Sequence, residues 1–284
     1  MRKQGYQPLR VKKYIFRDLL FHTFYTLVSA ATLGPIIWIF MLSFKTKKEF
    51  ATNPLSLPRS FFLGNYINAF TDSLLTTFFM NSIIVTSIAL ALILIISTLA
   101  GYSLARIKFS SSRILFMIFV MLDGLPIYIL IIPLYVMLNF LKLDNYLWGL
   151  IFTYVAMRTG VSIIIMRGFF RSIPSYLEDA AKIDGCNLLQ SLWYIMLPIV
   201  RPGLTVAAIM NFIFVWNEYY LATILLSKMT LFTVPPGLSC SFMGRYTTNW
   251  PAMAAGFTLT IIPTFLVFIF LQDKIIKGWS TIDK

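Results

Sequence analysis

The sequence has few charges, little histidine or cysteine, and no phosphate-binding loop. Only 12% of its 284 residues are charged and 58% are hydrophobic, which excludes an ordinary soluble domain and indicates a multi-spanning membrane protein. One histidine and two cysteines leave no evident metal site, so we expect no bound metal. No G-x4-G-K-[ST] segment occurs, so we expect the chain to bind no ATP in the usual way, and we predict no catalytic residues.

Long apolar runs predict an all-α bundle of six transmembrane helices. A bilayer core about 30 Å thick needs roughly 20 apolar residues per helix. Three runs contain no acid or strong base, namely 19–44, 73–105 and 246–272. Three more contain one each: 114–139 with Asp123, 146–166 with Arg158, and 202–226 with Glu218. The apolar run after the basic tail 1–18 lacks a small-residue cleavage site, so we expect a retained first helix and one transmembrane domain over 1–284.

The net charge of +13 follows the predicted topology, so it does not indicate nucleic-acid binding. With the N-terminus in the cytoplasm, seven basic residues fall outside: Lys45, Lys47, Lys48, Arg59, Lys142, Lys228 and Arg245. Of the remaining seventeen basic residues, sixteen fall inside and Arg158 lies within a predicted span. Both chain ends are therefore predicted to be cytoplasmic, with Lys45 to Lys48 as a local exception. Cys186 and Cys240 fall on opposite sides and are not expected to pair.

Two outside connections, 45–72 and 228–251, are long and show no strong helical periodicity. They either bind an extracytoplasmic partner or act as plain connectors. The inside connection, 171–200, instead carries helix signals. Ser175 with Glu178 predicts a capping box, and the helix that it starts is predicted to run to Gly185, which suits a left-handed C-terminal position.

A second helix in this connection is predicted to start at Asn187, capped with the glutamine three residues on, and to stop at Pro198. The first helix presents small residues and one acid on one side, which are Leu177, Ala180, Ala181 and Asp184. Two interpretations remain open. The helix either inserts into a groove of another protein, or lies in the membrane interface under the bundle.

The same connection resembles a known family. Asp179-Ala180-Ala181, three residues, Gly185, nine residues, Ile195, one residue and Leu197-Pro198 match the E-A-A-x3-G-x9-I-x-L-P signature of ABC importer permeases, with Asp179 replacing the leading Glu. The segments FFRSIPSYLEDAAKIDG, WNE and SFKTKKEFATNPLSLPRSFFLGNYINAF extend the match over nearly the whole chain. The chain is similar to the six-helix permease subunits of the maltose-type carbohydrate uptake family, although its final WSTIDK departs from the family's tail.

The resemblance implies a binding-protein-dependent sugar transporter in a bacterial cytoplasmic membrane. Its partners would be membrane lipid, a second homologous permease, an extracytoplasmic solute-binding protein, and a dimer of cytoplasmic ATPases that use ATP and magnesium. The implied ATPase-coupling residues are Glu178, Asp179, Ala180, Ala181, Asp184 and Gly185. Closure of the ATPases would move the helix that carries these residues as a rigid lever. The attached membrane helices would then shift between inward-open and outward-open arrangements. Gly185 then acts either as a hinge or close-contact position, or simply as a helix cap.

Ionisable groups inside the membrane are costly and usually face the bundle interior or water. Gly124 and Pro126 predict a kink in the third helix. Asp123 either contacts the substrate or pairs with Arg158, and Glu218 either lines the pathway or lies near the outer interface. The candidate pathway residues are Asp123, Tyr128, Trp216, Asn217 and Glu218.

Other functions remain open. Within ABC importers, the solute is alternatively glycerol phosphate or a polyamine. An ion-coupled secondary transporter would require paired intramembrane acids and matched halves, and no inverted repeat is evident. A channel or structural membrane protein would not need the ordered cytoplasmic helices.

Overall fold

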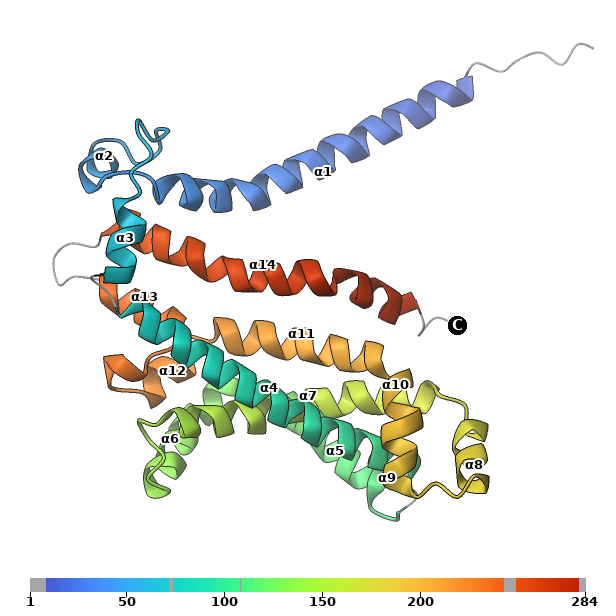
Figure 1. The fold of residues 1–284 in the computed structure, drawn as a ribbon. Helices are drawn as coiled ribbons and strands as arrows, with labels where there is room; N and C mark the ends of the chain where they lie inside the picture. The colour runs from blue at the N-terminus through green and yellow to red at the C-terminus, as the bar shows by residue number, and fades with distance from the viewer. Residues whose placement is uncertain (1–8, 72–73, 108, 243–248, 281–284) are drawn as a thin grey trace, which may run out of the picture.

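The structure is a computed structural model that describes residues 9–71, 74–107, 109–242 and 249–280, with side chains described in these ranges except at 9–17, 127, 128 and 271–280. Its regular elements in these ranges are all helices, which confirms the all-α prediction. The long helices are α1 (Leu9–Leu42), α4 (Leu75–Arg106), α7 (Leu147–Ser172), α11 (Arg201–Asn217) and α14 (Trp250–Ser280). Figure 1 shows α4, α7, α11 and α14 gathered in one bundle, from which α1 diverges toward its N-terminus.

The predicted count of six spanning helices is not confirmed. Four helical segments in the described ranges are long and apolar enough to cross a membrane, namely Asp18–Leu42, Leu75–Arg106, Leu147–Ser172 and Trp250–Phe270. A fifth is obtained if Leu188–Ile199 and Arg201–Asn217, which meet at a bend of 76°, count as one span. The predicted span at 202–226 is also interrupted, because α11 ends at Asn217 and a separate helix, α12 (Tyr220–Leu225), follows.

The predicted third span, 114–139, is broken where a kink was expected. It consists of α5 (Ser112–Asp123), the 3-10 turn η1 (Ile127–Leu130) and α6 (Ile131–Phe140). Pro126 has no N–H to donate and disfavours helical geometry at the residue before it, so the helix ends ahead of this proline. Neither α5 nor α6 alone is long enough to span the bilayer.

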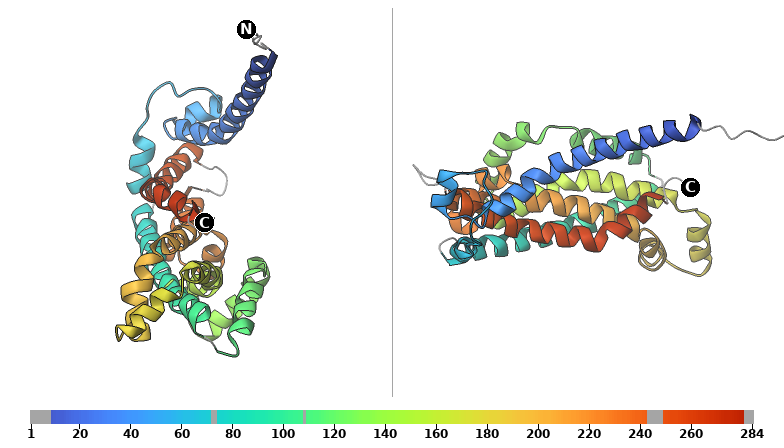
Figure 2. Two further views of the ribbon diagram at one scale, coloured as in Figure 1. Left: turned by 90° about the vertical axis from the view of Figure 1, so that its right-hand side faces the viewer. Right: turned by 90° about the horizontal axis from the view of Figure 1, so that it is seen from above.

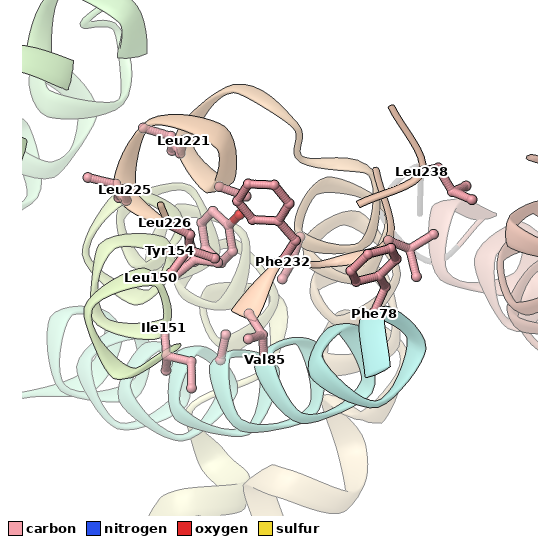
Figure 3. Close-up of a cluster of buried hydrophobic side chains, with 14 of the residues drawn as sticks. Phe78, Val85, Leu150, Ile151, Tyr154, Leu221, Leu225, Leu226, Phe232 and Leu238 are labelled. Atoms are coloured by element: carbon pink, nitrogen blue, oxygen red, sulfur yellow. The ribbon is translucent and has the colours of Figure 1, made fainter. Parts of the chain in front are cut away.

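The core forms around the contact between α4 and α7. Small residues allow the two backbones to approach closely: a Cβ atom added at Gly101 would lie 2.7 Å from Met166 Cβ. Farther along the same contact, side chains from both helices meet those of the chain segment after α11 (Figure 3). This cluster includes Phe78, Val85, Leu150, Ile151, Tyr154, Leu221, Leu225, Leu226, Phe232 and Leu238. The α4–α7 pair therefore forms the surface against which the chain segment after α11 packs.

The two long connections, which show no strong helical periodicity in sequence, contain short helices. The first holds α2 (Lys47–Thr52) and α3 (Gly64–Thr71), and the second holds the 3-10 turn η3 (Met229–Leu231) and α13 (Val234–Phe242). Two prolines follow Val234 in the first turn of α13, where the missing N–H groups cost nothing, so a proline-rich segment is compatible with a helix start. These helices lie at the end of the bundle opposite α8 (Tyr176–Ile183), as Figures 1 and 2 show.

Lys45, in the first of these connections, is a structural residue. It is only 1% exposed, and its Nζ donates to the carbonyls of Asn53 and Pro54 at 3.1 and 3.0 Å. Asn65 Nδ2 donates in turn to the Lys45 carbonyl at 2.7 Å. The lysine therefore has a folding role that accounts for its place in a segment expected outside. Cys186 and Cys240 are both free, which agrees with the prediction that they do not pair.

We expect Gly101→Ala to destabilise the α4–α7 contact by about 1–3 kcal/mol, because the new methyl group collides with Met166 and with the backbone of the neighbouring helix. Gly168→Ala is the matched control, because a Cβ there meets nothing within 4 Å, and alanine favours a helix over glycine by about 1 kcal/mol. Apparent melting temperatures in detergent measure both. Equal temperatures for the two variants would contradict this account of the contact.

Candidate functional site

The helix α8 lies beyond one end of the bundle, in the connection between α7 and α11 (Figure 1). It runs from Tyr176 to Ile183, and Gly185 follows it with φ of +84°, a left-handed conformation that glycine adopts without strain. The Cys186 N–H donates to the Ala181 carbonyl at 2.9 Å, closing the helix end. The predicted extent of this helix and its glycine end are confirmed.

The predicted capping box at the start of α8 is wrong. Ser175 has helical backbone angles and makes no side-chain cap hydrogen bond. Glu178 Oε2 instead lies 3.8 Å from Arg106 Nε, at the last residue of α4. The Arg106 guanidinium also donates to the carbonyl of Ile173, just after α7. One arginine thus joins the end of α4 to the end of α7 and to α8.

On the side of α8 that was expected to present small residues, some residues face the bundle and others are exposed. Ala181 is 2% exposed and Glu178 is 8% exposed, so both face the bundle. The exposed coupling candidates are Asp179, Ala180, Asp184 and Gly185. Ile183 shares the exposed side and is 87% exposed, the largest fraction of any described large hydrophobic residue. The outward surface of α8 therefore combines acidic and small residues with the exposed side chains of Tyr176, Lys182 and Ile183.

The second predicted helix starts as expected but does not stop at Pro198. Asn187 Oδ1 accepts from the Gln190 N–H, and Gln190 Oε1 accepts from the Asn187 N–H, each at 2.9 Å, which confirms this capping box. The helix α9 (Leu188–Gln190) continues through the π-helical turn η2 (Ser191–Met196) into α10 (Leu197–Ile199). The wider π turn moves the preceding carbonyls out of the α register, in which the proline ring would collide with one of them.

The WNE segment closes one helix and opens the next. Glu218 accepts from the N–H groups of Leu221 and Ala222 at 2.8 and 3.0 Å, capping α12, and its Oε2 accepts from the Tyr154 hydroxyl at 2.7 Å. Trp216 is buried, stacks on Phe212 with ring centroids 5.7 Å apart, and its Nε1 donates to the Thr260 carbonyl at 3.2 Å. Asn217 is exposed, and its side-chain amide donates to the Ile213 carbonyl one helical turn earlier. In this structure Glu218 and Trp216 therefore tie helices together.

Asp123 and Arg158 border one cavity of about 530 Å³ between α5, α6 and α7. No ion pair within 4 Å joins these two described side chains. Arg158 Nε donates to Asn211 Oδ1 on α11 at 3.0 Å, and its guanidinium lies 4.5 Å from the Phe214 ring centroid. Asn211 is fully buried and also donates to the Ser162 hydroxyl at 2.7 Å.

Pairing of Asp123 with Arg158 was one of two alternatives, and the Nε of Arg158 instead donates to an amide on another helix. The side chain of Tyr128, the remaining pathway candidate, lies outside the described residues. The proposed contacts of these residues with a transported solute stay predictions.

Sequence reasoning missed Arg106, Asn211 and Ile183. Arg106 was counted only as a topological charge, and its link to Glu178 spans 72 positions that no local pattern connects. Asn211 was hidden in an apolar run, although a single amide there signals a bond between helices. Ile183 falls at the end of a short helix with polar neighbours, and only the fold shows that nothing in the described chain covers it.

Comparisons with known proteins agree on one family. The family described as "Binding-protein-dependent transport system inner membrane component" matches residues 97–280. The diacetylchitobiose uptake system permease protein NgcG of Streptomyces coelicolor is 34% identical over 257 residues, covering 89% of this chain and 84% of that protein. The probable starch degradation products transport system permease protein AmyC of Thermoanaerobacterium thermosulfurigenes is 32% identical, covering 96% and 97%.

A solved structure supports the fold as well. A chain in the crystal structure of a bacterial ABC transporter that imports the acidic polysaccharide alginate superposes with a TM-score of 0.80 at 23% identity. The superposition covers 95% of this chain and 99% of that chain. Nearly the whole helical arrangement is therefore shared.

We expect Asn211→Leu to destabilise the protein by about 1–3 kcal/mol, because it leaves the half-buried Nε of Arg158 without its acceptor. Asp123→Asn should change stability by less than about 0.5 kcal/mol, because the Asp123 side chain is exposed and makes no ion pair with Arg158. Denaturant titration of the purified protein in detergent measures both. A large loss in Asp123→Asn that Arg158→Gln partly restores would instead establish direct pairing.

Proposed function

Because the chain belongs to the family of binding-protein-dependent transport system inner membrane components, we propose that it is one permease subunit of an ATP-driven carbohydrate importer. It is a multi-pass membrane protein, by its family and its long apolar helices. The similarity to NgcG and AmyC, named for the uptake of diacetylchitobiose and of starch degradation products, supports a carbohydrate as the solute. The subunit forms half of the transmembrane pathway and performs no chemistry of its own.

The observation that carries this proposal is the exposed face of α8. A helix that projects beyond the bundle with Ile183 and Ala180 uncovered is suited to a cleft in a second protein. That protein is a dimer of cytoplasmic ATPases, which binds ATP and magnesium, since this chain has no G-x4-G-K-[ST] loop. In this arrangement Asp179, Ala180, Asp184 and Gly185 contact the ATPase.

Glu178 and Ala181 serve the same coupling from the inner side of α8. Glu178 faces Arg106, and the Arg106 guanidinium also holds the carbonyl of Ile173, so a displacement of α8 pulls on α4 and α7 together. Arg106 Nε and Glu178 Oε1 are buried without a hydrogen-bond partner among the described residues. The 3.8 Å contact joins Arg106 Nε to the other carboxylate oxygen, Oε2, so the two side chains form a closer bond when ATPase closure moves α8.

The remaining partners occupy the other free surfaces. The homologous second permease completes the pathway, and the extracytoplasmic solute-binding protein contacts the opposite end, where α2, α3 and α13 lie. In this orientation α8 and both chain termini are cytoplasmic, in a bacterial cytoplasmic membrane. The excess of basic residues in the inside segments supports this orientation, and the buried bonds of Lys45 account for one basic residue outside.

The solute pathway includes the cavity beside Asp123 and Arg158, whose volume of about 530 Å³ suits a small ligand. The terminal nitrogens of Arg158 make no hydrogen bond in the described structure, so they are available to solute hydroxyl groups. The remaining pathway candidates are Tyr128, in η1, and Trp216, Asn217 and Glu218, at the C-terminal end of α11. For Trp216 and Glu218 this requires that their present bonds between helices open during transport.

The function is tested by reconstituting the chain with its ATPase, second permease and solute-binding protein in proteoliposomes. Accumulation of the carbohydrate held by that binding protein should require ATP on the α8 side and stop when ADP replaces ATP. A binding protein that retains a polyamine or glycerol phosphate would reassign the solute only. Uptake by this chain alone, driven by an ion gradient, would instead indicate a secondary transporter.

Docking through α8 is tested with Ile183→Asp. We expect this change to lower ATPase copurification at least about tenfold, since burying a side chain of this size is worth about 1.5–3 kcal/mol and a buried unpaired carboxylate is costly. Leu57→Asp is the matched control, because Leu57 is also exposed but lies in the connection between α2 and α3, two helices at the opposite end of the bundle. Normal recovery of the ATPase with Ile183→Asp, in a chain that still reaches the membrane, would remove α8 as the docking element.

A further inference from the structure

A second cavity, of about 540 Å³, opens between α5 and α7 at the end of the bundle that carries α8. Three arginines line it: Arg113 in the first turn of α5, and Arg167 with Arg171 in the last turns of α7. No carboxylate is among the lining residues. Neither the coupling contacts nor the solute cavity uses any of these arginines.

Among the described residues, no acid neutralises the positive charges in this cavity. Arg167 Nε donates to the Leu104 carbonyl at 3.3 Å, and its guanidinium lies 3.7 Å from the Phe116 ring centroid. None of the three arginines forms an ion pair within 4 Å with a described acid. Arg167 and Arg171 are one helical turn apart, so their like charges lie on the same side of α7. Cations held together at the end of a spanning helix favour an anionic partner.

The rest of the cavity is apolar. Phe116, Met117, Val120 and Met121 line it along α5, which runs from its basic first turn toward the bilayer interior. Met117, Val120 and Met121 are exposed in this chain. The site therefore combines a basic mouth with an apolar wall along the neighbouring helix. A small soluble anion would interact with the basic mouth but would leave the apolar wall uncovered.

We propose that this cavity binds an anionic phospholipid from the surrounding leaflet. Its phosphate accepts hydrogen bonds from Arg113, Arg167 and Arg171, whose planar forks suit phosphate oxygens. One acyl chain lies against Phe116 and Val120 on α5. The arginines stand where the spanning helices end, which is the depth of lipid headgroups, and basic pockets between helices at that depth suit such lipids. The lipid thereby links α5 to α7 next to the coupling helix.

The test uses the importer with all its subunits, reconstituted in nanodiscs of phosphatidylcholine mixed with phosphatidylglycerol. After transfer to detergent, native mass spectrometry measures the phosphatidylglycerol that stays bound. The combined variant Arg113→Gln, Arg167→Gln and Arg171→Gln should retain at least about tenfold less, because each arginine near a lipid surface contributes to attraction. The corresponding triple lysine variant keeps the charges and should retain most of it.

Arg201→Gln is the matched control, an exposed arginine at the same end of the bundle but outside the cavity, and it should retain lipid as the unchanged protein does. If the triple glutamine variant does not assemble, Arg171→Gln alone, at an exposed position, is measured and should show a smaller loss. Equal retention in the glutamine variants would overturn the proposal. Displacement of the lipid by inorganic phosphate or soluble glycerol phosphate would also overturn it, assigning the arginines to a soluble anion. Loss of a partner subunit with no loss of bound lipid would assign them to a protein contact.

Discussion

The close contact of α4 with α7 is the interaction on which the rest of the structure depends. Gly101 lets the two helices approach at Met166, and each end of the pair then holds a different part of the chain. At one end Arg106 connects α4 with Ile173 and Glu178, and so with α8. At the other end Tyr154 on α7 bonds Glu218, which starts α12. The α4–α7 pair therefore links α8 at one end to α12 at the other.

Several polar groups inside the bundle bond to partners on neighbouring helices. Arg158 donates to Asn211, and Asn211 donates to Ser162, so α7 and α11 are joined by a short chain of hydrogen bonds. Bonds of this kind matter in a membrane, where hydrophobic burial favours no particular helix neighbour over lipid. Asp123 differs, because it is exposed at the end of a broken helix and faces a cavity with no bonded partner described. Arg158 therefore stabilises the helix packing, whereas the Asp123 side chain takes no visible part in it.

The local signals of the sequence predicted local structure well. Asn187 with Gln190 forms its capping box, Gly185 takes the left-handed conformation, and Pro126 interrupts the third span, because each depends on neighbours within a few residues. The failures involve distant partners. Ser175 and Glu178 fit the capping pattern as well as Asn187 and Gln190 do, but Glu178 contacts Arg106 instead. The side of α8 that faces outward was also unpredictable, since it depends on how the helix lies against the bundle.

The π-helical turn at Ser191–Met196 has a consequence for the rotational phase of the helices on either side of it. Such a turn accommodates one residue more than an α-helix of the same rise, and each residue of an α-helix advances it by about 100°. Removing one residue here would return the turn to α-helical register, in which the Pro198 ring collides with a preceding carbonyl. It would also rotate α9 by about 100° relative to α10, and so displace the connection through Gly185 and Cys186 that joins α9 to α8. The contact of Glu178 with Arg106 would then be strained, although both residues would be unchanged. The length of this turn is therefore as strict a requirement as the identity of the residues it orients.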